Sequence, residues 1–170
     1  DLTITMIVPF PPGGPVDTTA RLTTQPLSQL WSVATPIENK AGANGNIASE
    51  YVVRSKPDGY TLIYNSSSVA LSPALYKNLS FDVQKDLAPV ILTTVVPMLL
   101  NVNNSVSATN FKEFVALLKA KPDSLSYGSA GVGNITHLAP FLVLEQLGLV
   151  ANHVPYKGSG PAMIGLVGGE

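Results

Sequence analysis

One stretch of the chain, Met6 to Arg21, constrains the fold more than any other. It opens with an apolar run typical of a buried strand, breaks at a cluster of prolines and glycines, and continues as a helix-like segment. A strand, a stiff turn and a helix in this order bring unpaired backbone N–H groups and the positive end of the helix dipole to one point. The stretch therefore predicts a site for an anion such as a carboxylate or phosphate. An ordinary Gly- and Pro-containing connection is the alternative that the stretch leaves open.

The predicted anion site consists of Phe10, Pro11, Pro12, Gly13 and Gly14. The prolines fix φ and stiffen the turn, while the glycines let a ligand approach the main chain without a Cβ in the way. Asp17 follows near the helix N-terminus, where its carboxylate fits either a dipole-stabilised cap or a pocket residue. In the second case Asp17 would repel a second carboxylate and favour a ligand with an amine or hydroxyl group.

The chain carries few charges for its length. Charged residues make up 12% of the sequence, the formal net charge is −1, and Lys and Arg form no cluster. Nucleic-acid binding is disfavoured because nothing would replace the counterions around the phosphates. Few cationic side chains are available for a small anion either, so backbone dipoles and hydroxyl groups are the expected binding groups.

Composition also disfavours other classes of site. The chain has no cysteine, which excludes disulfides and thiolate metal sites, and its two histidines lack ligand spacing, so we expect neither a metal nor a cofactor. The longest apolar run, Leu87 to Leu100, is short for a membrane span and contains Pro89 and Pro97. It predicts buried strands and no direct membrane insertion. No signal peptide is present, and a chain that begins at Asp1 predicts a form from which one has been removed.

The first half of the chain contains three successive β-then-α units. Strands are predicted at Leu2 to Val8, Val33 to Glu38 and Tyr60 to Tyr64, and they predict a parallel sheet with right-handed crossovers. The third strand leads directly into Ser66, Ser67 and Ser68, at the carboxyl end where open α/β sheets bind ligands. These hydroxyls are predicted either to contact a ligand or to cap a helix over Val69 to Leu75.

Two helix boundaries in the first half are predicted from single residues. A helix is expected over Asp17 to Gln25, and Pro26 is expected to kink or end it because proline lacks an N–H group. Its packing residues are predicted to be Val16, Ala20 and Leu22. Asn46, the last residue of a polar loop, is expected to cap the following helix.

The second half repeats the strand, turn and helix order of the first. Asn110 and Glu113 form a capping-box-like start to a helix over Phe111 to Ala120 with apolar residues at helical spacing. Leu125 to Leu138 then combines a strand, a Gly-rich turn and the start of a helix. That turn predicts a second anion site at Ser129, Ala130, Gly131 and Gly133, and a short strand over Asn152 to Tyr156 precedes the last helix.

The fold class predicted by this pattern is α/β with two lobes, each a parallel-rich sheet flanked by helices. Residues 1–97 are assigned to the first lobe and residues 98–170 to the second, with extended runs at Val90 to Val96 and Met98 to Val102 joined at Pro97. The last helix lacks the strand that would normally follow it. We therefore expect both lobes to be partial and the chain to be truncated at its C-terminus.

Six motifs in the right order resemble one known family. They are VPFPPGGPVDTTAR (8–21), ENKAGANGNIASE (38–50), PDGYTL (57–62), PALYKNLSFD (73–82), YGSAGVGNITHL (127–138) and HVPYKGSGPA (153–162). Together they resemble the tripartite tricarboxylate transporter receptors, also called the Bordetella uptake gene family of extracytoplasmic solute-binding proteins. The resemblance implies a periplasmic-binding-protein-like fold of type II, whose lobes close on a carboxylate-bearing metabolite and deliver it to integral membrane permease subunits.

The resemblance also implies roles for particular residues. Family members hold one carboxylate mainly through main-chain groups of two opposed turns and bridging waters, which correspond here to Phe10 to Gly14 and Ser129 to Gly133. Ser66 to Ser68 correspond to further contacts, and Asp17 and His137 stand where pocket residues are expected. The ligand classes implied are di- and tricarboxylates, aromatic carboxylates and acidic amino acids. Departures from the family pattern are Trp31, Pro26 and Pro140, which concern the packing of the helices behind the turns.

Two other functions were weighed against a receptor. A serine hydrolase would use Ser129, His137 or His153, and Asp17, but the sequence lacks the G-x-S-x-G elbow. A nucleotide site is unsupported because neither Gly-rich turn has a phosphate-loop pattern. His137 is expected either to donate to a ligand or to cap and pack, whereas His153, next to a strand, is expected to be structural.

Overall fold

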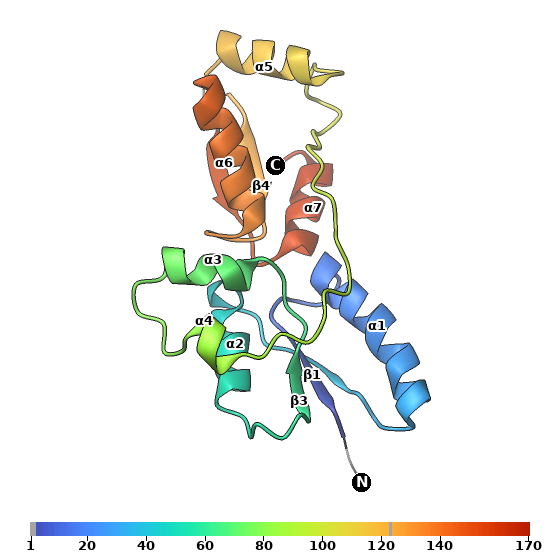
Figure 1. Ribbon diagram of the computed structural model, residues 1–170. Coiled ribbons are helices and arrows are strands. Elements are labelled where there is room, and N and C mark those ends of the chain that lie inside the picture. The colour runs from blue at the N-terminus through green and yellow to red at the C-terminus, as the bar shows by residue number, and fades with distance from the viewer. Residues whose placement is uncertain (1–2, 123) are drawn as a thin grey trace. The chain divides into compact units, whose positions relative to one another are not determined.

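The computed structural model describes residues 3–122 and 124–170, and the chain divides into two compact units, one up to Pro97 and one from Met98 to Glu170. Both units combine parallel strands with helices, and Figure 1 shows the elements in chain order. The start of the first predicted strand, at Leu2, lies outside the described residues. Because no placement of one unit against the other is defined, each is described by itself.

The first unit is built on a three-stranded parallel sheet. Its strands are β1 (Thr5–Val8), β2 (Ile37–Asn39) and β3 (Thr61–Ile63), in the order β2-β1-β3. Met6 pairs with Ile37 on one side and with Leu62 on the other. Ile7 and Val8 in the central strand are fully buried, as expected for a parallel sheet that is covered on both faces. The prediction of successive parallel β-then-α units is confirmed.

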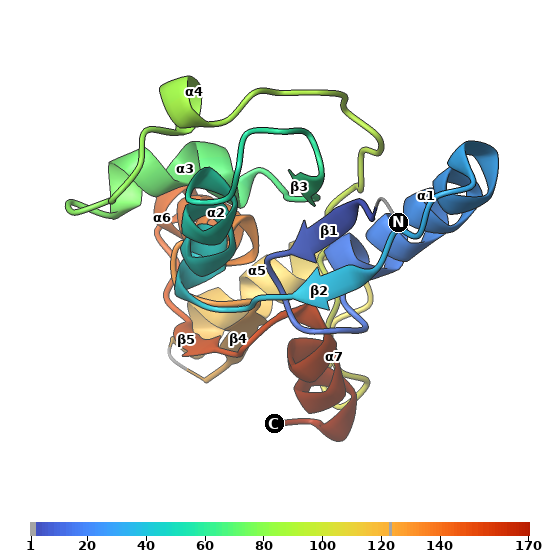
Figure 2. The same cartoon turned by 90° about the horizontal axis from the view of Figure 1, so that it is seen from below.

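Helices α1 (Pro15–Trp31), α2 (Asn46–Val53), α3 (Ser68–Leu75) and α4 (Val83–Asp86), with the short 3₁₀ turn η1 (Ala43–Gly45), complete this unit. Figure 2 shows α2 beside α3, and the two helices contact each other. Helix α1 does not end at Pro26, which is exposed, but continues to Trp31 and stops at Ser32 in the left-handed conformation. Ala20 is buried as predicted, whereas Leu22 is 69% exposed, so its predicted packing role is wrong.

The predicted helix cap at Asn46 is also wrong. The N-cap of α2 is Gly45, at φ 95°, and no side chain caps the helix. Asn46 is instead the first residue inside the helix. A cap residue has extended backbone and a side chain that turns back to the helix, and the left-handed Gly45 shifts the boundary by one residue.

The apolar run Leu87 to Leu100 was predicted to form buried strands, and this prediction is wrong. In the structure it has no regular secondary structure, and most of its large side chains are exposed; Val90, for example, is 81% exposed. A strand needs a partner backbone, and no described strand lies beside this run. A hydrogen bond of 2.5 Å between Tyr64 Oη and Thr93 Oγ1 attaches it to the end of β3.

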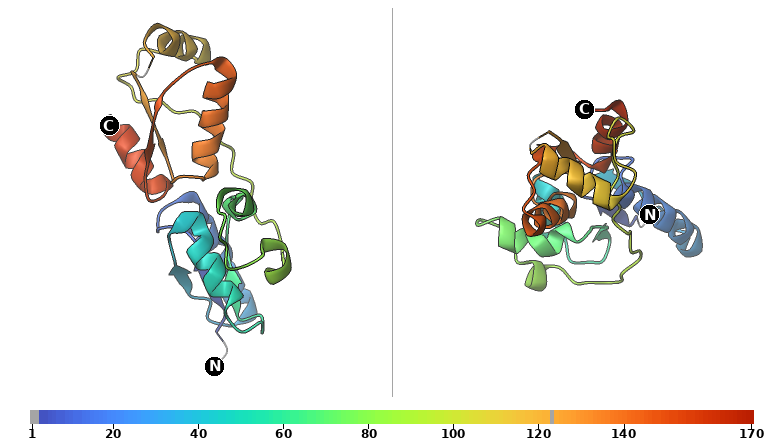
Figure 3. Two further views of the ribbon diagram at one scale, coloured as in Figure 1. Left: turned by 90° about the vertical axis from the view of Figure 1, so that its left-hand side faces the viewer. Right: turned by 90° about the horizontal axis from the view of Figure 1, so that it is seen from above.

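The second unit contains one parallel pair of strands, β4 (Ser126–Ser129) and β5 (Asn152–Pro155). Helices α6 (Ile135–Leu147) and α7 (Ser159–Gly168) pack against β4, and Figure 3 shows them on opposite sides of the strand pair. Helix α5 (Phe111–Ala120) begins as predicted, since Asn110 Oδ1 accepts from the Glu113 N–H group at 3.0 Å. Helix α6 continues past Pro140 and ends at Gly148, in the left-handed conformation.

Candidate functional site

Three loops meet at the carboxyl edge of the sheet in the first unit. Because the strands are parallel, the turn 10–14 after β1, the residues 40–45 after β2 and the residues 64–67 after β3 emerge at the same edge. A Cβ added at Gly45 would lie 3.1 Å from Pro9 Cβ and 3.6 Å from Ser68 Oγ. The second loop therefore lies directly against the other two.

The first turn leaves part of its main chain unpaired. The Gly13 N–H group donates to Asp17 Oδ2 at 2.9 Å, and Gly13 has a φ of 85° that favours glycine. Pro11 and Pro12 have no N–H groups. The N–H groups of Phe10, Gly14 and Val16 donate to no acceptor among the described residues. These groups, at the N-terminus of the 17-residue helix α1, form an electropositive patch of main chain.

The buried carboxylate of Asp17 stabilises this turn. Its side chain is 3% exposed and accepts from Arg21 Nε and Nη2, both at 3.0 Å, from Asn39 Nδ2 at 2.9 Å and from Gly13. The hydrogen bond from Arg21 lowers the pKa of Asp17 to about 2; burial acts in the opposite direction, and the bonds from Asn39 and Gly13 add to the lowering. Asp17 is thus an ionised carboxylate whose charge is compensated within the first unit. Its predicted contact with a ligand stays a prediction.

The serines after β3 differ from one another. Ser68 is 2% exposed and its Oγ lies 3.0 Å from Ser66 Oγ, which also accepts from the Ser68 N–H group at 3.4 Å. Ser67 is the N-cap residue of α3, yet its side chain makes no capping bond and it is exposed. Ser66 therefore supports the start of α3, and Ser67 retains an unused hydroxyl at the sheet edge.

The second turn, in the second unit, has its N–H groups held by side chains. Gly131 N–H donates to Ser129 Oγ at 3.2 Å, Ala130 N–H to Thr136 Oγ1 at 2.8 Å and Gly133 N–H to His137 Nδ1 at 3.2 Å. Ser129 is 1% exposed. Among the described residues the Val132 N–H group has no acceptor.

Two histidines contact the second turn, His137 through the Gly133 N–H group and His153 through Ser129. The imidazole rings of His137 and His153 are stacked with centroids 3.9 Å apart, and Tyr127 stacks on His153 at 5.0 Å. His153 Nε2 lies 2.7 Å from Ser129 Oγ. Burial lowers the pKa of His153, and the neighbouring His137 lowers it further. His153, expected to be structural only, is thus connected to the turn through Ser129, and the sequence did not indicate this because Tyr127 and His153 become neighbours only through strand pairing.

The family model described as "Tripartite tricarboxylate transporter family receptor" matches residues 19–170. The chain belongs to this receptor family. An Agrobacterium vitis relative, "UPF0065 protein in the TAR-I ttuE-ttuC' intergenic region", is 37% identical over 98% of this chain and 48% of its own length. "Protein BugT" of Bordetella pertussis is 36% identical over 98% of this chain and 52% of its own length. The chain spans about half the length of the curated relatives it matches.

Similar solved structures confirm the predicted fold class. The R. palustris protein Rpa4515 with adipate has a TM-score of 0.93 and 34% identity, covering 96% of this chain and 55% of its own. MatC (Rpa3494) from Rhodopseudomonas palustris with bound malate has a TM-score of 0.85 and 34% identity, covering 98% and 57%. The periplasmic binding protein BugD has a TM-score of 0.85 and 30% identity, covering 98% and 56%. The resemblance on which the sequence interpretation rested is likewise confirmed.

The hydrolase alternative is not supported in this receptor. Ser129 Oγ contacts His153, one of the two histidines considered for a triad, whereas His137 Nδ1 accepts from the Gly133 N–H group. Both oxygens of Asp17 are hydrogen-bonded to neighbours in the first unit. The carboxylate that a triad would need therefore has other partners, namely Gly13, Arg21 and Asn39.

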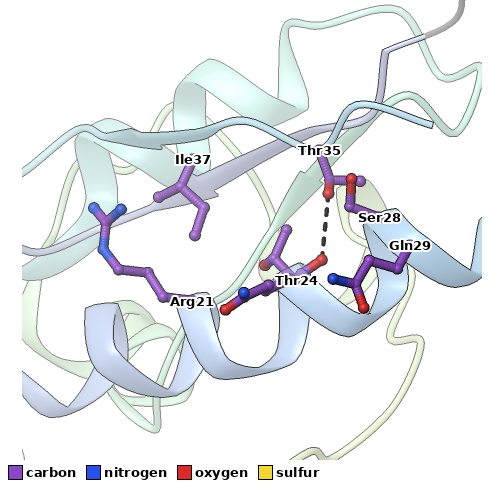
Figure 4. Close-up of a pocket in the computed structure, with 7 residues that line it drawn as sticks. Arg21, Thr24, Ser28, Gln29, Thr35 and Ile37 are labelled. Atoms are coloured by element: carbon purple, nitrogen blue, oxygen red, sulfur yellow. Dashed lines mark hydrogen bonds between the residues drawn. The ribbon is translucent and has the colours of Figure 1, made fainter. Parts of the chain in front are cut away.

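A surface depression in the first unit lies along helix α1. It has a volume of about 520 Å³ and is lined by residues of α1 and of the chain that leads into β2: Arg21, Thr24, Gln25, Ser28, Gln29, Thr35 and Ile37. Figure 4 shows these side chains, with the hydrogen bond from Thr35 Oγ1 to the Thr24 carbonyl at 3.3 Å. None of the predicted site residues lines it. Residues 3–122 and 124–170 contain no cluster of metal-ligating side chains, and no helix within them is long and apolar enough to cross a membrane.

Proposed function

We propose that this chain is part of a solute-binding receptor, without catalysis, that captures a small carboxylate-bearing metabolite for a tripartite tricarboxylate-type transporter. The observation that carries the proposal is the unpaired main chain of the turn 10–14 at the N-terminus of α1. A helix N-terminus with free N–H groups favours an anion without any cationic side chain. The adipate and malate bound by two structural neighbours are consistent with a di- or tricarboxylate, an aromatic carboxylate or an acidic amino acid as ligand.

The proposed ligand contacts in the first unit are the main chain of Phe10 to Gly14 and the hydroxyls of Ser66 to Ser68. The guanidinium of Arg21, beside the turn, is paired with Asp17, and the ammonium group of Lys40, which follows β2, is paired with Glu38. A carboxylate at the turn would therefore interact mainly with backbone N–H groups. Such charge-assisted hydrogen bonds contribute about 1.5–3 kcal/mol each.

The proposed contacts in the second unit are Ser129, Ala130, Gly131, Gly133 and His137. Side-chain acceptors hold three of the turn's N–H groups. A carboxylate is a stronger acceptor than a hydroxyl or a neutral imidazole because it is charged. We propose that ligand oxygens replace some of these side-chain acceptors on binding, in particular His137 Nδ1.

The family supports a proposal for location and partners. We propose that the protein acts in the periplasm and delivers its ligand to integral membrane permease subunits. A binding protein of this kind needs no cofactor, since its task is recognition and release.

A thermal-shift screen tests the proposed function. Mono-, di- and tricarboxylates, acidic amino acids, sugars and nucleotides are added separately, and the midpoint of thermal unfolding is measured. A ligand present at about 100 times its Kd stabilises the folded state by about 2.7 kcal/mol. We expect a selective rise with one class of carboxylate. A response to sugars or nucleotides, with none to acids, would contradict the proposal.

A further inference from the structure

Asn46 is a buried polar residue whose side chain has no hydrogen-bond partner among the described residues. Its side chain belongs to a residue that is 7% exposed, and neither Nδ2 nor Oδ1 makes a hydrogen bond. Buried amides in folded proteins are nearly always paired, because an unpaired one has lost its hydrogen bonds to water without replacement. Since Gly45 is the N-cap of α2, Asn46 does not serve its own helix either.

Three buried serines near Asn46 have hydrogen-bond partners. Ser49 Oγ donates to the Gly45 carbonyl at 3.1 Å, and Ser72 Oγ donates to the Ser68 carbonyl at 3.0 Å. Ser68 Oγ pairs with Ser66 Oγ. Asn46 therefore differs from its neighbours, and a leucine of similar volume would fill the same space without an unpaired amide.

The position of Asn46 relates it to the proposed anion turn. The preceding residue, Gly45, lies against Pro9, which leads into the turn 10–14. It also lies against Ser68, the last of the three serines after β3. Helix α2 thus begins between the two loops that are proposed to contact the ligand. The backbone that enters it is strained, since Ala43 and Asn44 have φ of 45° and 55°.

We propose that Asn46 is a ligand-binding residue whose amide contacts a second polar group of the ligand, remote from the carboxylate at residues 10–14. The proposal rests on the proposed function and adds a third loop to its site. An amide offers both a donor and an acceptor, which suits a second carboxylate, a hydroxyl or an amide group. Both amide atoms are covered in the structure, so contact requires rotation of the side chain toward the sheet edge. The ligand class that this residue selects is a metabolite with at least two polar ends.

The test compares two ligands on two variants. Succinate and butyrate have the same chain length, but butyrate lacks the second carboxylate. Isothermal titration measures both affinities for the wild-type protein, for Asn46→Leu and for Asn78→Leu, a matched control at an exposed asparagine of the same unit. We expect Asn46→Leu to lower the affinity for succinate ten-fold or more and to leave that for butyrate within two-fold, while Asn78→Leu changes neither. The unfolding midpoint of unliganded Asn46→Leu should equal or exceed that of the wild type, because an unpaired amide is removed.

The remaining outcomes separate this inference from the function on which it rests. If the wild type binds no carboxylate, the proposed function fails and the inference with it. If the wild type binds succinate and Asn46→Leu binds it equally well, only the role of Asn46 is refuted. An equal loss for succinate and butyrate, or a lower unfolding midpoint, would show a structural role and would also refute the inference.

Discussion

The two turns have the same strand-to-helix design but are braced by different chemistry. In the first turn, the buried carboxylate of Asp17 holds the Gly13 N–H group and is itself held by Arg21 and Asn39. In the second turn, neutral acceptors take the corresponding role, with Ser129 backed by His153. The comparison teaches that one main-chain motif can be preorganised by a carboxylate with a lowered pKa or by neutral side chains, one of which contacts a histidine whose pKa is lowered by burial. The first turn should therefore be insensitive to pH in the range where the second responds.

Removal of the charge in the first turn should have the largest effect. Asp17→Asn keeps the shape of the side chain but loses charge-assisted bonds to Arg21. We expect a loss of about 2–3 kcal/mol in the free energy of unfolding of the first unit. Urea denaturation measures it, and Asp58→Asn, at an exposed aspartate, is the matched control. A loss no greater than that of the control would show that Asp17 does not brace the turn.

The same residue should make stability depend on acid pH. The folded pKa of Asp17 is about 2 against 3.8 for the free group, so its contribution is fully present above pH 4 and is lost as the pH falls from about 4 to about 2. The expected contribution is of the order of 2 kcal/mol. It is measured as the difference between wild type and Asp17→Asn in denaturant midpoints across this range. Parallel pH curves for the two proteins would contradict the assignment.

Disruption of the second turn should lower the free energy of unfolding by less than Asp17→Asn does. Ser129→Ala removes the acceptor of the Gly131 N–H group and the partner of His153, with no change in net charge. We expect a loss of about 1–2 kcal/mol in unfolding free energy and weaker ligand binding. Ser126→Ala, at an exposed serine of the same strand, is the control for urea denaturation and titration. If both variants behave alike, Ser129 does not organise the turn.

The smallest expected effect is the pH response of the second turn. Because burial and His137 lower the folded pKa of His153, the neutral form is favoured in the folded protein. Its contribution to stability is therefore present above the unfolded pKa of about 6.5 and is lost as the pH falls below it. His153→Gln can keep the bond to Ser129 but cannot titrate. We expect the wild type to lose stability between pH 7 and pH 5, and His153→Gln to lose none. Thermal unfolding of both proteins at pH 7 and at pH 5 measures the difference.

Local features of the fold could be predicted from the sequence. The Pro- and Gly-rich turn and the Asn110 cap depend on residues close together in the chain, and the parallel sheet follows from the alternation of strands and helices. Such features can be predicted from sequence because proline, glycine and capping side chains act on the backbone within a few residues. The motifs likewise indicated the receptor family correctly.

Features that depend on distant partners were not predictable. The apolar run Leu87 to Leu100 has the composition of buried strands, yet burial needs a partner that composition does not specify. The link from His153 to Ser129 exists only because β5 pairs with β4. Asn46 was expected to be a cap. This prediction failed because the left-handed φ of Gly45 sets the start of the helix, and the asparagine itself does not encode that conformation.

One substitution tests the central claim that backbone N–H groups at the first turn bind the ligand's carboxylate. Gly14 has a φ of −82°, which proline can adopt, and its N–H group is unpaired, so Gly14→Pro removes a single donor. Gly14→Ala keeps that donor, and the added Cβ would lie 3.9 Å from the nearest atom, the Pro11 carbonyl oxygen. Titration with the carboxylate found in the thermal-shift screen should show a ten-fold or greater loss of affinity for Gly14→Pro and near wild-type affinity for Gly14→Ala. Equal affinities for the two variants, with unchanged folding, would contradict the account.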